Sequence, residues 1–153
     1  MTHVFGATSK TILLVDDNPD DRELALLAFD ALGLRQQVQV AEDGAAALDH
    51  LFEIERSRDR PLPPLPSIVL LDLKLPRMTG LEVLQQIRSH ERTRSLPVVI
   101  LTTSTEDRDL VQSYSLGCNS YIRKPVDFEQ FQEAIRQLGL YWLLLNQVPL
   151  PKF

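Results

Sequence analysis

Three carboxylates, one hydroxyl and one ammonium follow or end short apolar segments at four separate places in the sequence. Asp16 and Asp17 follow TILLV, Asp72 follows SIVLL, Thr102 ends VVILT and Lys124 follows SYIR. The carboxylates suit a hard divalent cation, because Mg²⁺ is typically bound by one or two carboxylates together with phosphate oxygens. The lysine and the threonine suit a phosphoryl group, because they supply a positive charge and a neutral hydrogen-bond donor.

Asp72 is the residue that we expect to react. A carboxylate can attack phosphorus to form an acyl phosphate, and this transfer needs mainly alignment and charge stabilisation, which a metal ion and a lysine supply. We expect Asp17 and Asp72 to bind the metal directly and Asp16 to act through water. The metal would offset the repulsion between the carboxylates, which is about 4 kcal/mol per pair at about 4 Å and an effective dielectric constant near 20.

These side chains meet only if the apolar segments form a parallel sheet. The first segment is a short, β-branched run that fits a strand buried on both faces. The expected strands are 11–15, 38–44, 67–76, 96–103 and 120–124, and the expected helices are 19–33, 45–58, 79–91, 106–117 and 127–139. Strands that alternate with helices imply a doubly wound α/β fold with right-handed crossovers, and the ligand site of such a fold lies at the carboxyl ends of its strands.

The acidic run after the first strand also contains the start of a helix. Asn18 can cap this helix, Pro19 suits its first position, and Asp20 and Asp21 favour the positive end of its dipole. We therefore interpret Asp20 and Asp21 as helix-start residues. The apolar face of the helix is expected to consist of Leu24, Leu27 and Ala28.

Composition favours a single cytoplasmic domain. The 153 residues are 44% apolar and 24% charged, which suits one hydrophobic core. Because the net charge is -5, Lys and Arg are not in excess and we expect no nucleic-acid binding. Cys118 is the single cysteine and no signal peptide is visible, which indicates a reducing compartment. The apolar runs fall short of the roughly 20 residues that a membrane span needs, so no membrane association is expected.

From about Thr11 to Gly139 the sequence resembles the receiver domain of two-component response regulators. The blocks that carry the resemblance are the strand ending in Asp-Asp, LLDLKLPRMTG, VVILTTS and GCNSYIRKP. The spacings from Asp72 to Thr102 and on to Lys124 agree with the family as well. The resemblance implies a flavodoxin-like (βα)5 fold with a five-stranded parallel sheet in the strand order 2-1-3-4-5.

The resemblance also implies the chemistry of the site. Asp72 would accept a phosphoryl group from the phosphohistidine of a sensor histidine kinase, and Lys124 would assist. The metal, Mg²⁺ or Mn²⁺, would be bound by Asp16, Asp17, Asp72 and the main-chain carbonyl of Lys74. Such a protein is a signalling switch that assists its own phosphorylation and dephosphorylation, and is not an enzyme in the turnover sense.

A conformational switch and an unusual peptide bond follow from the same resemblance. The hydroxyl of Thr102 would move to the phosphoryl group, and the ring of Tyr121 would turn inward into the vacated space. A half-buried ring that simply packs on the sheet is the other interpretation of Tyr121. The bond between Lys124 and Pro125 would be cis, which is accessible because X-Pro bonds have only a small trans preference.

The two ends of the chain are interpreted separately from the domain. We expect residues 1–9 to be an N-terminal tail, residues 10–140 to form the receiver domain and residues 141–153 to be an apolar extension without an output domain. The output would then be a protein contact, dimerisation or onward transfer of the phosphoryl group.

The C-terminal segment LYWLLLNQVPLPKF is unusually apolar for the end of a surface helix. Tyr141, Trp142 and Leu145 either fold back onto the domain or form a homodimer or partner surface, because exposed apolar surface commonly marks an interface. Together with the SYSLGCNSYI and LTTS segments, this tail resembles the small response regulators that partner bacterial phytochromes and commonly dimerise. A phytochrome is therefore a candidate for the sensor kinase.

Three other functions fit parts of the pattern. A phosphate hydrolase of the haloacid dehalogenase type uses a similar aspartate, but it looks like Asp-x-Asp-x-Thr, whereas DLKLP from Asp72 lacks the second carboxylate. A flavodoxin-like nucleotide binder needs a loop rich in Ser, Thr or Gly where Asp16 and Asp17 stand. A receiver-like scaffold that is never phosphorylated would have no use for the intact residue set.

Overall fold

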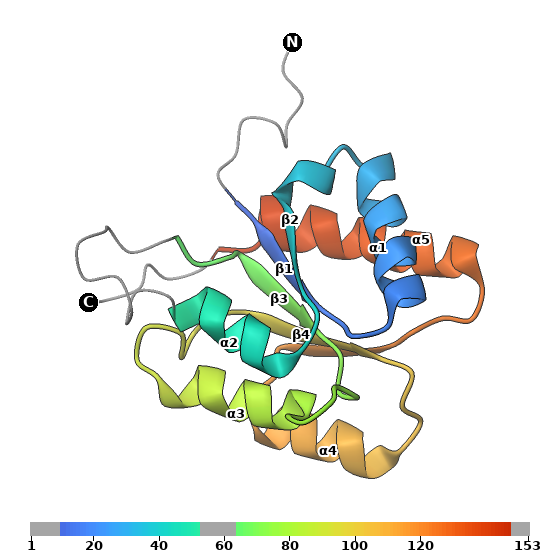
Figure 1. Cartoon of the computed structure of the whole chain (residues 1–153). Coiled ribbons are helices and arrows are strands. Elements are labelled where there is room, and N and C mark those ends of the chain that lie inside the picture. Colours follow the sequence, from blue (N-terminus) through green and yellow to red (C-terminus); the bar gives the residue numbers. More distant parts are fainter. Residues whose placement is uncertain (1–9, 53–63, 148–153) are drawn as a thin grey trace.

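The structure, a computed structural model, describes residues 10–52 and 64–147. In this part of the chain a parallel sheet is covered by helices on both faces (Figure 1). The strands are β1 (Ile12–Val15), β2 (Val38–Ala41), β3 (Ile68–Leu71), β4 (Val98–Thr102) and β5 (Ser120–Arg123). The helices are α1 (Pro19–Ala31), α2 (Gly44–Phe52), α3 (Gly80–Ser89), α4 (Asp107–Ser115) and α5 (Phe128–Leu140), with a 3-10 turn η1 (Arg35–Gln37) and a π-helical turn η3 (Tyr141–Leu145).

The sheet has the strand order β2-β1-β3-β4-β5, and each neighbouring pair is parallel. This confirms the doubly wound fold and the order 2-1-3-4-5. Val15 of β1 pairs with Leu71 of β3, so the next residue on each of these strands is an aspartate at the same edge of the sheet. The register therefore places Asp16 beside Asp72.

Both faces of the central strands are buried, as the apolar runs predict. Leu13 and Val15 of β1 pack on the side of α2 and α3, whereas Ile12 and Leu14 pack on the side of α1 and α5. Figure 1 shows the same division, with α1 and α5 on one face of the sheet and α2, α3 and α4 on the other. A sheet held from both sides fixes the strand ends that carry the polar residues.

The start of α1 is confirmed, but its predicted apolar face is right only at Ala28. Asn18 Oδ1 accepts hydrogen bonds from the backbone N–H groups of Asp20 (2.9 Å) and Asp21 (3.0 Å). Leu24 and Leu27, however, are exposed, and the buried residues of α1 are Ala25, Ala28 and Phe29. The predicted and the buried residues both have helical spacing, and the buried face is shifted by one residue from the predicted one. The small alanines on the buried face let the helix lie close to its neighbours.

The predicted strands are longer than the observed ones. The second strand ends at Ala41 instead of residue 44, because Asp43 begins the turn into α2: its Oδ1 accepts a hydrogen bond from the N–H of Ala46 (2.7 Å). Residues 1–9, residues 53–58 of the predicted second helix, residues 60–63 of the proline-rich loop and residues 148–153 lie outside the described residues. The limits of tail, domain and extension remain predictions.

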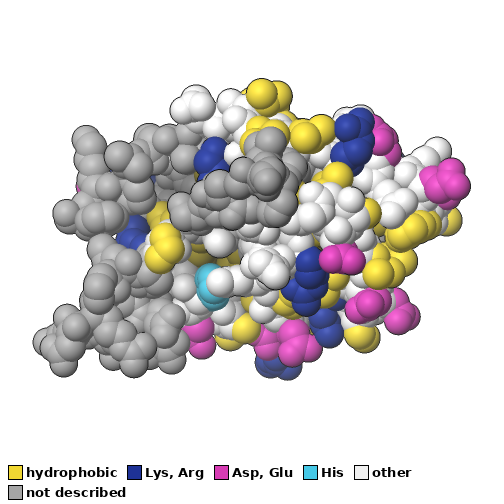
Figure 2. Space-filling model, turned by 90° about the horizontal axis from the view of Figure 1, so that it is seen from above, with side chains coloured by type: hydrophobic (Ala, Val, Ile, Leu, Met, Phe, Trp, Pro, Cys, Tyr) yellow, Lys and Arg dark blue, Asp and Glu magenta, His cyan; other side chains and the backbone are white. Residues whose placement is uncertain are grey.

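The molecular surface mixes charge and apolar groups. In Figure 2, Lys and Arg side chains lie beside Asp and Glu side chains on the face that is seen from above, with hydrophobic side chains between them. Among the helices in the described part of the chain, none has the length and apolar character needed to cross a membrane.

Candidate functional site

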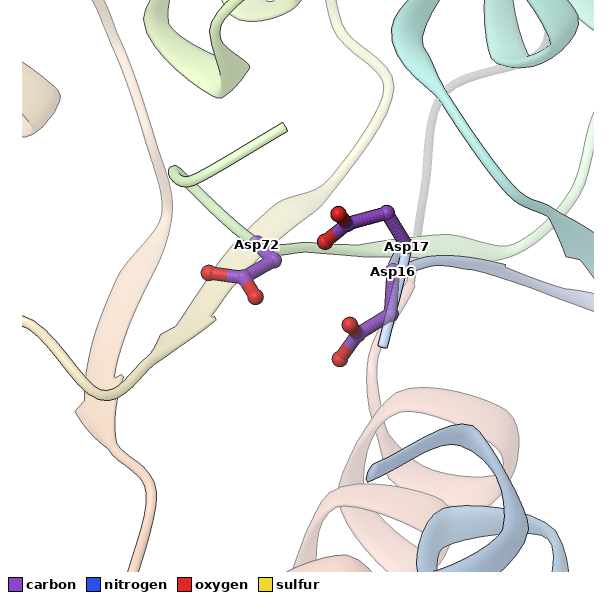
Figure 3. Close-up of side chains that lie close together, drawn as sticks. All are labelled: Asp16, Asp17 and Asp72. Atoms are coloured by element: carbon purple, nitrogen blue, oxygen red, sulfur yellow. The ribbon is translucent and has the colours of Figure 1, made fainter. Parts of the chain in front are cut away.

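The three predicted metal-binding carboxylates come together at one edge of the sheet. Oxygen atoms of Asp16, Asp17 and Asp72 all lie within 4.8 Å of one another. Asp16 and Asp72 are buried, whereas Asp17 is exposed. Figure 3 shows Asp16 and Asp17 at the end of β1 and Asp72 at the end of β3, with their side chains on the same side. The sequence therefore predicted this cluster correctly as a spatial group.

Backbone hydrogen bonds hold the two buried aspartates in place. The N–H of Asp72 donates to the carbonyl of Val15 (3.0 Å), which extends the β1–β3 pairing by one residue. Oδ1 of Asp16 accepts from the N–H of Asn18 (3.0 Å), and Oδ1 of Asp72 accepts from the N–H of Lys74 (3.3 Å). These short turns use one carboxylate oxygen of each residue and leave Oδ2 for the site.

Lys124 is buried between three carboxylates. Its side chain is only 6% exposed, and Nζ donates to Oδ2 of Asp16 (2.7 Å), Asp21 (2.9 Å) and Asp72 (3.2 Å). A lysine ammonium has three donors, so each is used. The N–H of Lys124 donates to the carbonyl of Thr102 (2.7 Å), which fixes the backbone at the end of β5.

The electrostatics of the cluster suit an additional cation. Burial raises the pKa of Asp16, although its hydrogen bond from Lys124 acts in the opposite direction. Burial by itself would lower the pKa of Lys124, but hydrogen bonds to Asp16 and Asp21 and the charge of Asp72 raise it, so the ammonium stays charged. Four carboxylates with a single ammonium leave an excess of negative charge, and carboxylate oxygens are the donors that Mg²⁺ and Mn²⁺ prefer.

The hydroxyl of Thr102 lies in the interior at the end of β4. Thr102 is completely buried, and its Oγ1 accepts a hydrogen bond from the N–H of Ser104 (3.2 Å). Ser104 Oγ in turn donates to Oδ2 of Asp109 in α4 (2.6 Å). The sequence did not indicate this link, which ties the loop after β4 to the start of the next helix.

Tyr121 packs inward in this structure. Its ring contacts the core cluster between the sheet and α2 and α3, and its hydroxyl is buried without a hydrogen-bond partner among the described residues. Burial raises the pKa of this phenol. The position agrees with sheet packing, and the switch role of Tyr121 remains a prediction.

The expected cis bond between Lys124 and Pro125 is wrong, because residues 10–52 and 64–147 contain no cis peptide. An X-Pro bond still favours trans by about 0.5–1 kcal/mol. With the trans bond, the next residue, Val126, is fully exposed to solvent.

Asp21 is the site residue that sequence reasoning missed. We interpreted it as part of the helix start, which holds for its backbone N–H, but its carboxylate lies against Lys124 (2.9 Å). The direction of helical side chains could have revealed this, because they tilt toward the amino terminus of the helix. An aspartate in the first turn of α1 can therefore reach the strand end that precedes it.

The apolar C-terminal turn both folds back and remains partly exposed. Leu143 is buried, its carbonyl accepts a hydrogen bond from Lys10 Nζ (2.8 Å), and Trp142 packs against the core cluster of α1 and α5. Tyr141 and Leu145 are exposed, Leu145 to 70%. The fold-back interpretation therefore holds for Trp142, whereas the interpretation of Tyr141 and Leu145 as a partner surface remains a prediction.

Comparison with known proteins agrees with this geometry. Residues 12–136 match the response regulator receiver domain. Among curated proteins, the probable methanogenesis regulatory protein FilR2 of Methanothrix harundinacea is 45% identical over 140 residues, which are 92% of this chain and 88% of that protein.

Solved structures with the same fold include regulators of phytochromes. The phosphorylated cyanobacterial phytochrome response regulator RcpA has a TM-score of 0.82 and 32% identity, over 93% of this chain and 99% of that one. The bacteriophytochrome response regulator RtBRR is 50% identical with a TM-score of 0.71, over 93% and 85%. The Mn²⁺-bound form of response regulator Rcp1 is 31% identical with a TM-score of 0.77, over 92% and 99%.

The family match begins in β1 and runs into α5, so it spans the strands that deliver Asp16, Asp17, Asp72, Thr102 and Lys124 to one edge of the sheet. This chain therefore belongs to the response regulator receiver domain family.

Proposed function

We propose that this chain is the phosphoacceptor of a two-component phosphorelay, in which Asp72 receives a phosphoryl group from the phosphohistidine of a sensor histidine kinase. The observation that carries the proposal is the contact of Lys124 Nζ with Asp72 Oδ2 (3.2 Å) inside a cluster of carboxylates at the end of the sheet. The closeness of the Asp72 carboxylate, the Lys124 ammonium and the carboxylates of Asp16 and Asp17 supports a nucleophile, a positive charge and metal ligands acting together.

The transfer uses few protein groups. An oxygen of Asp72 attacks phosphorus, the P–N bond to the imidazole breaks, and its electron pair stays on the leaving nitrogen. Lys124 neutralises the negative charge on the phosphoryl oxygens. Mg²⁺ or Mn²⁺, held by Asp16, Asp17, Asp72 and the carbonyl of Lys74, supplies further charge neutralisation and orientation when bound. The carboxylate donors of this chain and the Mn²⁺ of Rcp1 support this assignment.

Thr102 and Tyr121 are the proposed switch. The Thr102 hydroxyl turns toward the phosphoryl group and gives up the hydrogen bond from Ser104, which changes the loop between β4 and α4. Tyr121 occupies the space that the hydroxyl leaves. The protein thus acts as a signalling switch and not as an enzyme with a released product.

A phytochrome is the proposed class of sensor kinase, which RtBRR at 50% identity and RcpA support. FilR2, whose name refers to the regulation of methanogenesis, is 45% identical, so a test of phosphotransfer should also include sensor kinases that are not phytochromes. A cytoplasmic location and the lack of a nucleic-acid partner remain predictions from composition.

Incubation with acetyl phosphate and Mg²⁺ tests the central proposal. We expect the intact mass to rise by one phosphoryl group, hydroxylamine to remove it, and a chelator to prevent its addition. Asp72→Asn should show no adduct, because the amide lacks the nucleophilic oxygen of a carboxylate. A wild-type chain without the adduct contradicts the proposal and favours a receiver-like scaffold. An adduct that persists in Asp72→Asn contradicts the assignment of Asp72 as the acceptor.

We also propose that Tyr141, Trp142 and Leu145 contribute to a homodimer surface. Leu145→Asp should weaken the dimer about tenfold or more, because a buried leucine contributes about 1.5–3 kcal/mol. Light scattering with and without acetyl phosphate measures the molecular mass. The matched control is Leu27→Asp, which changes an exposed leucine of α1. A wild-type monomer in both states, or equal effects of the two variants, argues against this surface.

A further inference from the structure

Asp21 contacts the phosphorylation site but has no role in the proposed transfer. Its Oδ2 lies 2.9 Å from Lys124 Nζ, and its side chain is 30% exposed, compared with 6% for Lys124. Its backbone N–H is occupied by the cap residue Asn18 (3.0 Å), so its position on α1 is fixed. The carboxylate is therefore a defined partner of the ammonium at the solvent side of the site.

The three donors of Lys124 are all occupied before a phosphoryl group arrives. Asp16 makes the shortest contact (2.7 Å) and is buried, whereas Asp72 carries the phosphoryl group itself. A phosphoryl oxygen needs at least one of these donors. Asp21 is the partner that can be released at the lowest cost, because a partly exposed carboxylate regains water when it loses the ammonium.

We propose that Asp21 is the resting-state counter-ion of Lys124 and that it competes with the phosphoryl group for the ammonium. The inference rests on the proposed function of Asp72. Asp21 is a positioning residue, since it acts through Lys124. Its charge holds the ammonium on the α1 side of the site and adds to the repulsion that an incoming phosphoryl dianion meets.

Removal of the charge of Asp21 should strengthen binding of a phosphoryl group, in contrast to the loss that damage to the site would cause. For Asp21→Asn we expect about fivefold tighter binding of beryllofluoride, an anion that mimics the phosphoryl group, and about fivefold faster phosphorylation by acetyl phosphate, both at saturating Mg²⁺. Binding is measured by fluorine NMR and phosphorylation by intact mass. Asp21→Ser, which also removes the charge and keeps a polar residue at the helix start, should show the same gain.

Asp20→Asn is the matched control. Asp20 is the adjacent residue of α1, it is exposed, and it carries the same charge, but the donors of Lys124 are taken by other carboxylates. We expect its beryllofluoride affinity to stay close to that of the wild type. Unchanged or weaker binding in both Asp21 variants, or an equal gain in Asp20→Asn, overturns the inference. A wild type that takes no phosphoryl group from acetyl phosphate overturns the proposed function and this inference together.

Discussion

Lys124→Met is expected to lower the free energy of unfolding by about 3 kcal/mol, because removal of one partner from a buried ion pair leaves an uncompensated buried charge. Two of the three carboxylates around Nζ, those of Asp16 and Asp72, are almost fully buried. Methionine has a similar length and is apolar, so the change removes the charge without opening a large cavity. Urea denaturation at neutral pH measures the loss.

The same variant should lose most of its phosphorylation by acetyl phosphate, since no other lysine or arginine contacts Oδ2 of Asp72 among the described residues. Mg²⁺ should recover part of the lost stability, because a cation that binds only the folded state stabilises it by about 1.4 kcal/mol for each tenfold excess over its dissociation constant. The increase in the free energy of unfolding on addition of Mg²⁺ should be larger for Lys124→Met than for the wild type.

Arg123→Met provides the control for Lys124→Met. Arg123 is the preceding cation on β5, it is exposed, and its Nε donates to the carbonyl of Ser104 (3.2 Å). Loss of this hydrogen bond should cost about 1 kcal/mol. If the two variants lose equal stability, or if Lys124→Met retains normal phosphorylation, the central place of Lys124 in the site is wrong.

The sheet and most of the site could be predicted because their signals are local. A short apolar run followed by a carboxylate indicates a buried strand with an acidic residue at its end. Parallel pairing of β1 and β3 then brings Asp16 and Asp72 together. The roles of these residues were inferred from their chemistry and from the family resemblance, and they await the phosphorylation assay. Their positions are confirmed.

The errors share a cause, which is that two local patterns fitted equally well. Leu24 and Leu27 have the same helical spacing as the residues that α1 buries, and only packing against the sheet and α5 selects between the faces. Asp21 satisfied the preferences of a helix start, so only the tilt of its side chain toward the start of the helix pointed to its contact with Lys124, 103 positions away. The isomer of the Pro125 bond is also decided by its surroundings.

Gly80→Ala is expected to displace Asp72, although Gly80 lies at the other end of the loop between β3 and α3. A Cβ at Gly80 would collide with the carbonyl oxygen of Asp72 and lie 2.7 Å from Cα of Leu73, and real Cβ atoms do not approach this closely. Both contacts are backbone, and the N–H of Gly80 already donates to the carbonyl of Leu73 (2.9 Å). The first turn of α3 must therefore move away from the end of β3, or Asp72 must move.

Either movement changes the segment that carries Asp72 and the proposed carbonyl ligand of Lys74. We expect Gly80→Ala to cost about 1–3 kcal/mol of stability, as for other overpacked sites, and to slow phosphorylation by about tenfold to hundredfold, because small misplacements of reacting groups are costly. Urea denaturation and intact mass after treatment with acetyl phosphate measure the two effects.

Gly33→Ala separates this effect from the general cost of replacing a glycine. Gly33 has a positive φ of 74°, but a Cβ there meets no atom within 4 Å among the described residues. The backbone strain should cost about 1 kcal/mol and leave phosphorylation unchanged, since Gly33 follows the far end of α1. A Gly80→Ala protein that is phosphorylated at the wild-type rate would show that the loop absorbs the added methyl group without moving Asp72, and that close packing at Gly80 serves stability alone.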